Sequence, residues 1–463
     1  MAESLLMSYE TAVTQMYALG HELAQTPSHK FDLAHMRVLM AALGHPEKSF
    51  PSVLIAGTNG KGSTAATLAS VLQGAGLKSG LYTSPHLMHI NERIQVDGEP
   101  IRDDDFALLH GVVDRTAERL VTEGDLPWHP SFFEMLTAMA FEHFARVRPA
   151  VAVLEVGMGG RLDATNVVEP QVSVITDIAL DHQKYLGNTI GEIAREKAGI
   201  IRPGGVVVTL PQLPEANDVL GNTILDLGAR AVNAVPYVPP VSPASTEYLV
   251  TRGQWSVASG QPPVAQRYPL EVRGETIQVE SPLVGRHQLR NLALAIAAAE
   301  ELHNQGFTQI TPKAIERGIR DTHWPGRFQV VPSNGARPEY VLDVAHNPAG
   351  AWALRSTLSA AYGERPLTMA FGVLRDKAVA EIAEILFPIA EQVIVTHANN
   401  PRSASPEEIR QAAKRVAGDI REAPDVAAAL EHAGKIAGRG GLVVVTGSIY
   451  IVGEAMQRLG VRI

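Results

Sequence analysis

The stretch "VLIAGTNGKGST" (Val53 to Thr64) runs from an apolar segment through a glycine-rich turn into the start of a helical pattern. A strand, such a turn and a helix, in that order, form the loop with which many proteins hold phosphate. The stretch departs from the usual G-x-x-x-x-G-K-[ST] spacing, because Ile55 replaces the first glycine and Gly62 replaces the hydroxyl residue after Lys61. It therefore predicts a nucleotide-binding loop of an uncommon kind.

The chemistry of this loop rests on three glycines and one cation. Gly57, Gly60 and Gly62 let the backbone approach phosphate, the first N–H groups of the helix face the anion, and Lys61 adds a positive charge. An ordinary turn can also be rich in glycine, but it has no reason to hold a lysine among three of them. The hydroxyl that would bind Mg²⁺ must then come from elsewhere, and Ser84 in "YTSPHL" is either that ligand or a simple turn residue. The other candidates are Ser63 and Thr64.

Composition excludes several classes of protein. A chain of 463 residues, 45% of them hydrophobic, is long enough for two or three globular domains. The net charge of -9 and the lack of a dense Lys/Arg run argue against nucleic acid as a partner, because the phosphate backbone requires clustered cations. The absence of cysteine excludes disulfides, thiolate zinc sites and thiol nucleophiles, so oxygen or imidazole groups must hold any metal.

The N-terminal segment and the hydropathy lead to an expectation about location. Glu3, Glu10 and Glu22 interrupt the first 25 residues, which is not the pattern of a signal peptide. No run of 18 apolar residues occurs farther along the chain. We therefore expect a cytoplasmic protein without membrane contact.

Short apolar runs alternate with helix-length amphipathic segments from residue 52 onward, which is typical of a parallel α/β sheet. The runs are continuous, so helices should cover both faces of the sheet. This pattern predicts a P-loop-containing, doubly wound α/β domain. Strands are expected at 52–56, 151–157, 172–178 and 205–210, and helices from residue 61, from residue 131 and over 189–200.

The residue pattern changes twice in the second half of the chain. Residues 234–284 are rich in proline and in period-2 stretches, which predicts a small antiparallel insert before a long Ala/Leu helix at 288–306. The α/β alternation then restarts and predicts a smaller, Rossmann-like C-terminal domain. We place the domains at 1–326 and 327–463, with Pro325-Gly326 as either a hinge or a surface turn. Strands of the second domain are expected at 340–347, 367–373, 392–398 and 441–448.

Charged side chains follow several of these strands, at the edge where an open α/β sheet binds its ligands. Glu155 ends an otherwise apolar strand, which is costly without a cation or partner and favours a metal ligand. Asp177, Asp181 and His182 follow the next strand. His182 alone would be an unusual ligand for Mg²⁺, because this ion prefers oxygen.

Other polar residues keep two interpretations on spacing alone. Arg161 and Asp163 can form an ordinary ion pair within a loop, and Lys197 fits a solvated position on a helix. Asp343 can bind ribose or base and His346 can meet phosphate, yet both can equally be capping and loop residues.

Eight motifs cover nearly the whole chain. They are "AGTNGKGST" (56–64), "TSPHL" (83–87), "NERIQVDG" (91–98), "LEVGMGGRLDATN" (154–166), "DHQKYLGNTIGEIAREKAGIIRPG" (181–204), "GRHQLRNLALAIAA" (285–298), "WPGRF" (324–328) and "LDVAHNPAG" (342–350). In these motifs and their order, the chain resembles the folylpolyglutamate synthase/dihydrofolate synthase branch of the Mur ligase family.

The resemblance implies an ATP-dependent ligase that adds L-glutamate to dihydropteroate and to the γ-carboxylate of reduced folates. ATP would convert the substrate carboxylate into an acyl phosphate, which the amine of glutamate then attacks. The implied cofactors are ATP and Mg²⁺, and a monovalent cation such as K⁺ is left open. We expect a monomer whose partners are these small molecules. An enzyme with folylpolyglutamate synthase activity alone is the alternative.

The resemblance also assigns site residues by motif. The ATP contacts are Thr58, Asn59, Gly60, Lys61, Gly62, Ser63, Asn291, Arg327, Asp343 and His346. The magnesium ligands are Ser84, Glu155, His182 and Lys197, and Lys197 sits where the family carries a lysine carbamylated by CO₂. The pterin or pteroate contacts are Gln25, Thr26, Pro27, Ser28, Ser131, Phe132, Phe133, Glu134, Leu162, Asp163 and Ala164. The expected catalytic residues are Lys61, His182 and Lys197.

Other nucleotide-binding classes fit the sequence less well. A P-loop kinase or GTPase would not require a second doubly wound domain, and a non-catalytic regulator would not need several ligands around one metal. A cell-wall Mur ligase that acts on a UDP-muramoyl peptide typically has a hydroxyl residue after the lysine and a separate N-terminal domain. Here Gly62 follows the lysine, and residues 1–52 precede the loop.

Overall fold

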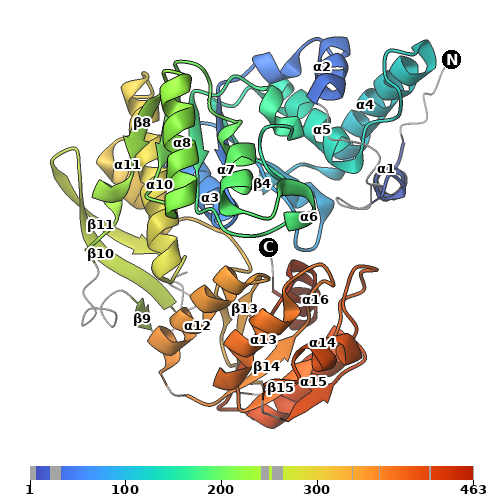
Figure 1. The fold of residues 1–463 in the computed structure, drawn as a ribbon, viewed down its shortest axis with the longest axis vertical. Helices are drawn as coiled ribbons and strands as arrows, with labels where there is room; N and C mark the ends of the chain where they lie inside the picture. The colour runs from blue at the N-terminus through green and yellow to red at the C-terminus, as the bar shows by residue number, and fades with distance from the viewer. Residues whose placement is uncertain are drawn as a thin grey trace. The chain divides into compact units, whose positions relative to one another are not determined.

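The computed structural model describes residues 7–20, 33–240, 250–252, 264–335, 337–363, 365–416 and 419–461 (Figure 1). The chain divides into two compact units, and the chain passes between them more than once. The first unit is Met1–Val238 with Asn291–Gly318, and the second is Pro239–Arg290 with Ile319–Ile463.

An eight-stranded sheet forms the centre of the first unit, in the order β4-β3-β2-β5-β1-β6-β7-β8. The strands from β2 to β8 in this order run parallel, whereas β3 and β4 add an antiparallel hairpin at one edge. The strands are β1 (Ser52–Ala56), β2 (Ser79–Tyr82), β3 (Ile94–Val96), β4 (Glu99–Pro100), β5 (Val151–Glu155), β6 (Val172–Ile175), β7 (Val206–Thr209) and β8 (Arg230–Asn233). The four strands predicted for this sheet are confirmed as β1, β5, β6 and β7.

Helices cover this sheet because its strands are apolar on both faces. Helix α3 packs on β1, β2 and β5, while α1, α2, α4 and α5 pack against one another at the upper right of Figure 1. The helices are α1 (Tyr9–Ala18), α2 (Leu33–Ala42), α3 (Lys61–Gly74), α4 (Asp103–Glu123), α5 (Phe132–Val147), α6 (Gln183–Leu186), α7 (Ile190–Ala198), α8 (Pro214–Asp226), α10 (Arg286–Asn304) and α11 (Pro312–Arg320). Short 3-10 turns include η2 (Ile90–Arg93) and η3 (Ala164–Val167). In the described part of the chain, no helix is both long enough and apolar enough to cross a membrane.

Helices α3 and α11 approach each other closely enough for their backbones to touch. A methyl group added at Gly318 would lie 2.3 Å from the Cα atom of Val71, and one added at Gly74 would lie 2.7 Å from the carbonyl oxygen of Ala314. The hydroxyl of Ser70 donates a hydrogen bond of 2.7 Å to the carbonyl of Gly318. Glycine is therefore required at this contact because a side chain has no room there.

The second unit begins with the predicted antiparallel insert, which is confirmed. Its three strands are ordered β11-β10-β9, and both pairings are antiparallel. They are β9 (Val250–Arg252), β10 (Val264–Val272) and β11 (Glu275–Ser281). Because β9 contacts helix α12, the insert belongs to the second unit, whereas the boundary expected at residue 326 would assign it to the first. That boundary stays a prediction.

A six-stranded sheet completes the second unit, in the order β12-β13-β17-β14-β15-β16. All of its strands are parallel except β12, which pairs antiparallel with β13. The strands are β12 (Gln329–Val331), β13 (Glu339–Asp343), β14 (Leu367–Phe371), β15 (Gln392–Val395), β16 (Ile420–Glu422) and β17 (Leu442–Thr446). The four strands predicted here are confirmed as β13, β14, β15 and β17.

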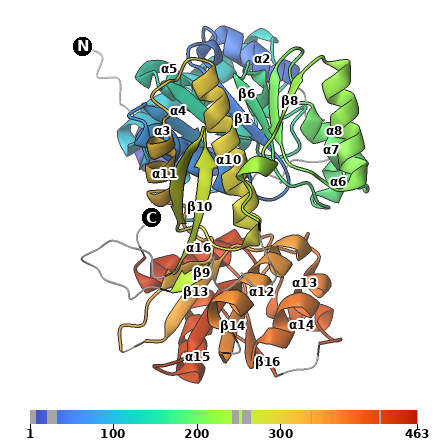
Figure 2. The same ribbon diagram turned by 90° about the vertical axis from the view of Figure 1, so that its left-hand side faces the viewer.

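The helices of this unit give it the doubly wound, Rossmann-like form that the sequence predicts (Figure 2). Helices α12, α13 and α14 pack in succession, while α15 and α16 pack against each other and on the central strands. They are α12 (Pro348–Tyr362), α13 (Val379–Leu386), α14 (Pro406–Ala412), α15 (Val426–Ala437) and α16 (Ile449–Leu459). The carboxyl ends of the parallel strands in each unit are therefore the edges at which to look for ligand-binding residues.

Candidate functional site

The glycine-rich loop connects β1 to the first turn of α3, as the sequence predicts. Gly60 caps the helix with φ +90°, and the N–H of Thr64 donates to its carbonyl at 2.9 Å. The N–H groups of Lys61 and Gly62 therefore lie at the open end of the helix, where a helix binds anions. At Gly57 a methyl group would lie 1.7 Å from the hydroxyl of Thr176, so the tight path of the loop demands glycine.

The loop is fastened to the residues that follow β6. The N–H groups of Thr58 and Asn59 both donate to the carbonyl of Asp177, at 2.8 and 3.1 Å. The hydroxyl of Thr58 donates to the carbonyl of Ala179 at 3.0 Å and accepts from its N–H at 3.1 Å. Thr58 and Asn59 thus hold the shape of the loop. The N–H groups at its open end belong to Lys61 and Gly62.

Two predicted ATP contacts, Lys61 and Asn291, lie at this loop. The ammonium group of Lys61 is 3.4 Å from the carbonyl of Thr58. Asn291 comes from α10, and a methyl group at Gly60 would lie 2.1 Å from its side-chain oxygen. The hydroxyl of Thr64 donates to the carbonyl of Asn291 at 3.4 Å. The structure therefore brings a residue far away in the sequence to the N-terminus of α3.

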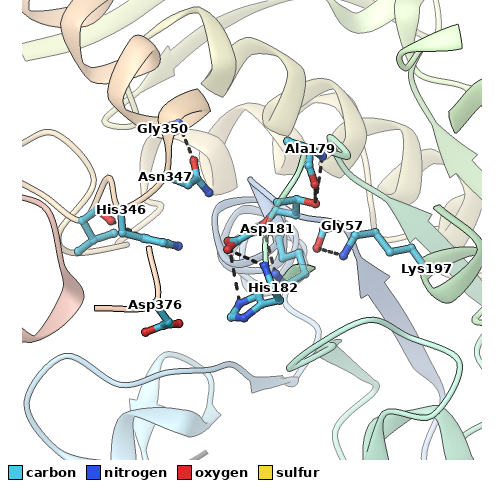
Figure 3. Close-up of polar contacts among 12 residues, drawn as sticks. Gly57, Ala179, Asp181, His182, Lys197, His346, Asn347, Gly350 and Asp376 are labelled. Atoms are coloured by element: carbon cyan, nitrogen blue, oxygen red, sulfur yellow. Dashed lines mark hydrogen bonds and ion pairs between the residues drawn. The ribbon is translucent and has the colours of Figure 1, made fainter. Parts of the chain in front are cut away.

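Lys197 lies beneath the loop rather than on a solvated helix face. The residue is 3% exposed, and its amine donates to the carbonyl of Gly57 at 2.8 Å (Figure 3). Burial and repulsion by Lys61 lower the pKa of Lys197 to about 7, although Asp181 and Asp163 oppose the shift. The interpretation as a solvated lysine is wrong, because helix α7 turns this residue inward.

Two of the predicted magnesium ligands are brought together. Glu155 ends β5 beside Ile55 of β1, and the residue is 4% exposed. The backbone N–H of Ser84 donates to this carboxylate at 3.1 Å. The serine hydroxyl and the carboxylate are the oxygen donors that Mg²⁺ prefers, so these residues fit the ion chemically.

His182 occupies a turn that its neighbour Asp181 stabilises. Its backbone has φ +49°, and its N–H donates to the carboxylate of Asp181 at 2.8 Å. Its ring Nε2 lies 3.9 Å from the other oxygen of Asp181. Figure 3 shows the two side chains next to each other. Among the described residues, no three His, Asp or Glu side chains are grouped as a ready-made metal site.

The first predicted pterin segment, Ser131 to Glu134, begins helix α5. The Glu134 carboxylate accepts from the N–H and the hydroxyl of Ser131, at 2.8 and 2.6 Å, and the N–H of Glu134 donates back to this hydroxyl at 3.3 Å. Phe132 is buried and stacks on Tyr17, with ring centroids 5.8 Å apart. The ring of Phe133 lies against Gly157, where a methyl group would be 2.5 Å from it. The segment thus has a structural task of its own.

The second predicted pterin segment, Leu162 to Ala164, contains a buried acid. The carboxylate of Asp163 accepts from the N–H of Met158 at 3.0 Å and from the N–H and hydroxyl of Thr165 at 3.0 and 2.5 Å. Burial raises the pKa of Asp163, and these hydrogen bonds oppose the rise. The loop ion pair with Arg161 does not form, because Arg161 pairs with Glu196 at 2.9 Å instead.

These two segments are neighbours in the fold. The turn η3, which begins at Ala164, contacts both α5 and α2, and Gly157 precedes it beneath Phe133. The remaining segment, Gln25, Thr26, Pro27 and Ser28, lies outside the described residues. Helix α2, the next described element after it, reaches η3.

In the second unit, Asp343 ties two loops to the end of β13. One carboxylate oxygen accepts from the N–H of Phe328 at 2.8 Å, and the other accepts from the N–H of Ala345 at 2.9 Å. Burial raises the pKa of Asp343, while Arg327 and these two hydrogen bonds lower it. Arg327 and Asp343, both predicted to contact ATP, are thus neighbours in the same unit.

The residues after Asp343 also serve the start of α12. A ring nitrogen of His346 lies 2.9 Å from the carbonyl of Val344. Asn347 caps the helix, because its side-chain oxygen accepts from the N–H of Gly350 at 2.8 Å (Figure 3). The capping role that spacing left open therefore belongs to Asn347 rather than to Asp343 or His346.

The sequence assigns no role to two charged residues that the structure buries. Glu92 is 9% exposed and Arg93 is 2% exposed, although both lie in the motif "NERIQVDG". The available signal was the position of this charged pair between Ile90 and Ile94, since charged residues in an apolar setting are buried only with partners.

Comparison with known proteins gives consistent results. Residues 326–449 match the family model described as Mur ligase, glutamate ligase domain. The chain is 34% identical to the dihydrofolate synthase/folylpolyglutamate synthase of Bacillus subtilis, over 92% of this chain and 94% of that protein. It is also 34% identical to the folylpolyglutamate synthase of Lacticaseibacillus casei, over 98% and 99% of the two chains. The solved structure of Mycobacterium tuberculosis folylpolyglutamate synthase complexed with ADP and AMPPCP matches with a TM-score of 0.82 at 33% identity, over 97% and 99%.

Proposed function

This chain belongs to the dihydrofolate synthase/folylpolyglutamate synthase branch of the Mur ligase family, and we propose that it catalyses both reactions of that name. It is an ATP-dependent ligase that joins glutamate to folates. The finer proposal is that dihydropteroate and the γ-carboxylate of reduced folates are both accepted. One observation carries the site assignment: a buried lysine, Lys197, lies against the carbonyl of Gly57 in the phosphate loop.

The reaction has to overcome the low reactivity of a carboxylate. Transfer of the γ-phosphoryl group of ATP to a carboxylate oxygen releases ADP and leaves an acyl phosphate, whose phosphate is a good leaving group. The amine of L-glutamate then attacks the carbonyl carbon, phosphate leaves, and the nitrogen loses a proton to give the amide. Positioning and stabilisation of negative charge supply most of the catalysis in such transfers.

The phosphate loop supplies this stabilisation. The open end of α3 directs the N–H groups of Lys61 and Gly62 outward, and the Lys61 ammonium adds a full charge. Thr58 and Asn59 keep the loop in place through the carbonyl of Asp177. We assign the triphosphate of ATP to this loop, with Asn291 beside it. We also assign ATP contacts to Arg327, Asp343 and His346 of the second unit.

We propose that Mg²⁺ is held by Ser84, Glu155, His182 and a carbamylated Lys197. When bound, the ion would neutralise phosphate oxygens during transfer. The contact between Ser84 and the buried Glu155 carboxylate supports this assignment, since both side chains offer oxygen. An additional carboxylate at Lys197 would supply the oxygen ligand that the unmodified residues lack.

Carbamylation suits the surroundings of Lys197. The reaction with CO₂ consumes a neutral amine, forms an N–C bond and releases one proton, and a pKa of about 7 keeps neutral amine available near neutral pH. The product keeps one N–H, which can still donate to the carbonyl of Gly57. It also replaces a cation that repels Lys61 with an anion that attracts it.

We place the pteroyl group near Ser131 to Glu134 and Leu162 to Ala164. The contacts among α5, η3 and α2 support this placement, because they bring these segments together. The monomeric state, the use of K⁺ and the cytoplasmic location stay predictions.

A ligation assay tests the proposal. The purified protein is incubated with MgATP, L-glutamate, bicarbonate and either dihydropteroate or tetrahydrofolate, and products are identified by mass spectrometry. Both substrates should gain a glutamyl group, with ADP formed in equal amount. Reactions without glutamate and reactions with the Lys61→Ala variant serve as controls. Addition to tetrahydrofolate alone would reduce the function to folylpolyglutamate synthase, and addition to neither would overturn the proposal.

A further inference from the structure

The loop that carries Ser84 connects β2 to η2 and is held at several points. At its start, the N–H of Thr83 donates to the carbonyl of Arg93 at 3.0 Å, and the N–H of Ser84 donates to Glu155 at 3.1 Å. The rest of the loop returns to two consecutive residues of η2, Glu92 and Arg93. Its conformation therefore depends on side chains that lie outside the loop.

The carboxylate of Glu92 accepts hydrogen bonds from three residues in the second half of the loop. The N–H of Leu87 donates to one oxygen at 2.7 Å, and the N–H groups of Met88 and His89 donate to the other at 2.8 and 2.5 Å. The carboxylate is buried, so these charge-assisted hydrogen bonds replace its hydration. Three successive N–H groups can meet one side chain only if the backbone curves around it.

Arg93 fixes the middle of the loop through His86. Its Nε–H donates to Nδ1 of His86 at 2.9 Å, and its guanidinium lies over the ring of Phe132, 5.3 Å from the centroid. Arginine can only donate, so Nδ1 of His86 must carry a lone pair. Neutral His86 then holds its proton on Nε2 and donates it to the hydroxyl of Tyr17 at 3.2 Å. This chain of donors fixes both the ring orientation and the tautomer of His86.

We propose that Glu92 and Arg93 are positioning residues, which hold the loop so that Ser84 presents its hydroxyl to the Mg²⁺ and phosphate site. The inference rests on the proposed function, because Ser84 has a ligand only if the enzyme uses Mg²⁺ with ATP. It gives the motif "NERIQVDG" a task in catalysis that requires no contact with any substrate. Groups behind metal ligands act in this way by fixing ligand orientation.

The first test is Glu92→Gln, which keeps the shape of the side chain but turns one acceptor into a donor. The concentration of Mg²⁺ that gives half-maximal activity should rise about tenfold, as is typical for supports of metal ligands, while the KM values for glutamate and folate stay the same. Calorimetric titration with ADP supplies a readout besides activity. The variant should lose affinity for ADP in the presence of Mg²⁺ and keep the affinity of the wild type in its absence.

Glu99→Gln is the matched control, because Glu99 lies exposed on β4, in the hairpin that follows η2. It should match the wild type in both measurements. An unchanged Mg²⁺ dependence of Glu92→Gln would overturn the inference, and so would equal loss of ADP affinity with and without Mg²⁺. In the Ser84→Ala background, Glu92→Gln should add no further shift, since the ligand that it positions is gone. Additive shifts would also overturn it.

A pair of substitutions at His86 keeps the inference testable if Glu92→Gln fails to fold. The side-chain oxygen of Asn lies near the place of Nδ1, and that of Gln lies near the place of Nε2. His86→Asn therefore keeps an acceptor for Arg93, whereas His86→Gln removes it. His86→Gln should need several-fold more Mg²⁺ than His86→Asn, and equal requirements would overturn the role of Arg93. If the wild type is inactive but binds ADP in a Mg²⁺-dependent way, the proposed function is wrong. The ADP titration of the variants then still decides whether Glu92 and Arg93 position Ser84.

Discussion

The phosphate loop of the first unit and the end of β13 in the second unit occupy equivalent places, after an apolar parallel strand. Burial acts on one ionisable group in each, lowering the pKa of Lys197 and raising that of Asp343. At Asp343 both carboxylate oxygens are engaged by backbone N–H groups, which hold the loop around Phe328. At Lys197 the amine donates a hydrogen bond to the carbonyl of Gly57 and remains a candidate for modification. The two sites therefore use a buried ionisable group differently: Asp343 holds the backbone in place, and Lys197 on α7 is a candidate for reaction.

The largest effect should come from removing the charge at the phosphate loop. Lys61→Ala should lower kcat about 10²–10³-fold, because one preorganised group that stabilises developing charge is lost. The measurement is single-turnover formation of ADP, and Lys48→Ala, at an exposed position, is the control. A loss below tenfold would show that the open end of α3 stabilises phosphate without the lysine.

The next effect concerns Lys197. Lys197→Ala should lower activity about 10–100-fold, as expected for a lost ligand or its support, and acetate or formate should restore part of it. Rescue is expected because the modified side chain would supply a carboxylate. Steady-state rates with and without added carboxylate give the result, with exposed Lys184→Ala as the control. Full activity in the variant would show that Lys197 supplies no group that the reaction needs.

A smaller effect should follow from crowding the loop. Gly60→Ala places a methyl group 2.1 Å from the Asn291 side-chain oxygen, at a residue with φ +90°. We expect a loss of about 1–3 kcal/mol in unfolding free energy, typical of overpacking, measured by urea denaturation. Gly60→Ala combined with Asn291→Ala should recover part of the loss. If the double variant is no more stable, backbone strain rather than crowding is the cause.

A comparable or smaller effect is expected at the architectural site. Asp343→Asn leaves an amide facing one backbone N–H and should cost about 1–3 kcal/mol of unfolding free energy. Urea denaturation of this variant and of the exposed control Asp321→Asn gives the difference. Unchanged stability together with a raised KM for ATP would show that Asp343 binds the nucleotide rather than stabilises the fold.

The smallest expected effect is a dependence of the unfolding free energy on pH. Because burial raises the pKa of Asp343 above its ordinary 3.8, the folded state holds this proton to higher pH than the unfolded state does. The contribution of Asp343 to unfolding free energy is therefore fully present below pH 3.8 and is lost as pH rises through the raised pKa. Unfolding of the wild type and of Asp343→Asn between pH 4 and 7 should show their difference shrinking with pH. A growing difference would contradict this sign.

Much of the fold was readable because parallel strands buried on both faces form continuous apolar runs. The strands at Ser52–Ala56 and Leu442–Thr446 were predicted for this reason. The short strands β3, β4, β8, β12 and β16, which lie at or next to the sheet edges, were not predicted. Several of them are partly or wholly exposed, so pairing with a neighbour rather than their own sequence makes them strands.

The site was predictable where a motif names a side chain and unpredictable where the backbone acts. Glu155 lies beside Ser84 and Lys197 lies beside Gly57, while their role as metal ligands stays a prediction. The carbonyl of Asp177, which fastens the loop, carries no sequence signal because every residue has one. The partner of the loop residue Arg161 is Glu196 on helix α7, and such a distant pair cannot be chosen from one sequence.

The contact between α3 and α11 lies at the end of α3 opposite the phosphate loop. A helix of 14 residues is a stiff rod about 21 Å long, and this one has the phosphate loop at one end and Gly74 at the other. A side chain added at Gly318 would collide with the backbone of α3 at Val71, in the last turn of the helix. We therefore expect a substitution at Gly318 to act on the phosphate loop only through the far end of α3.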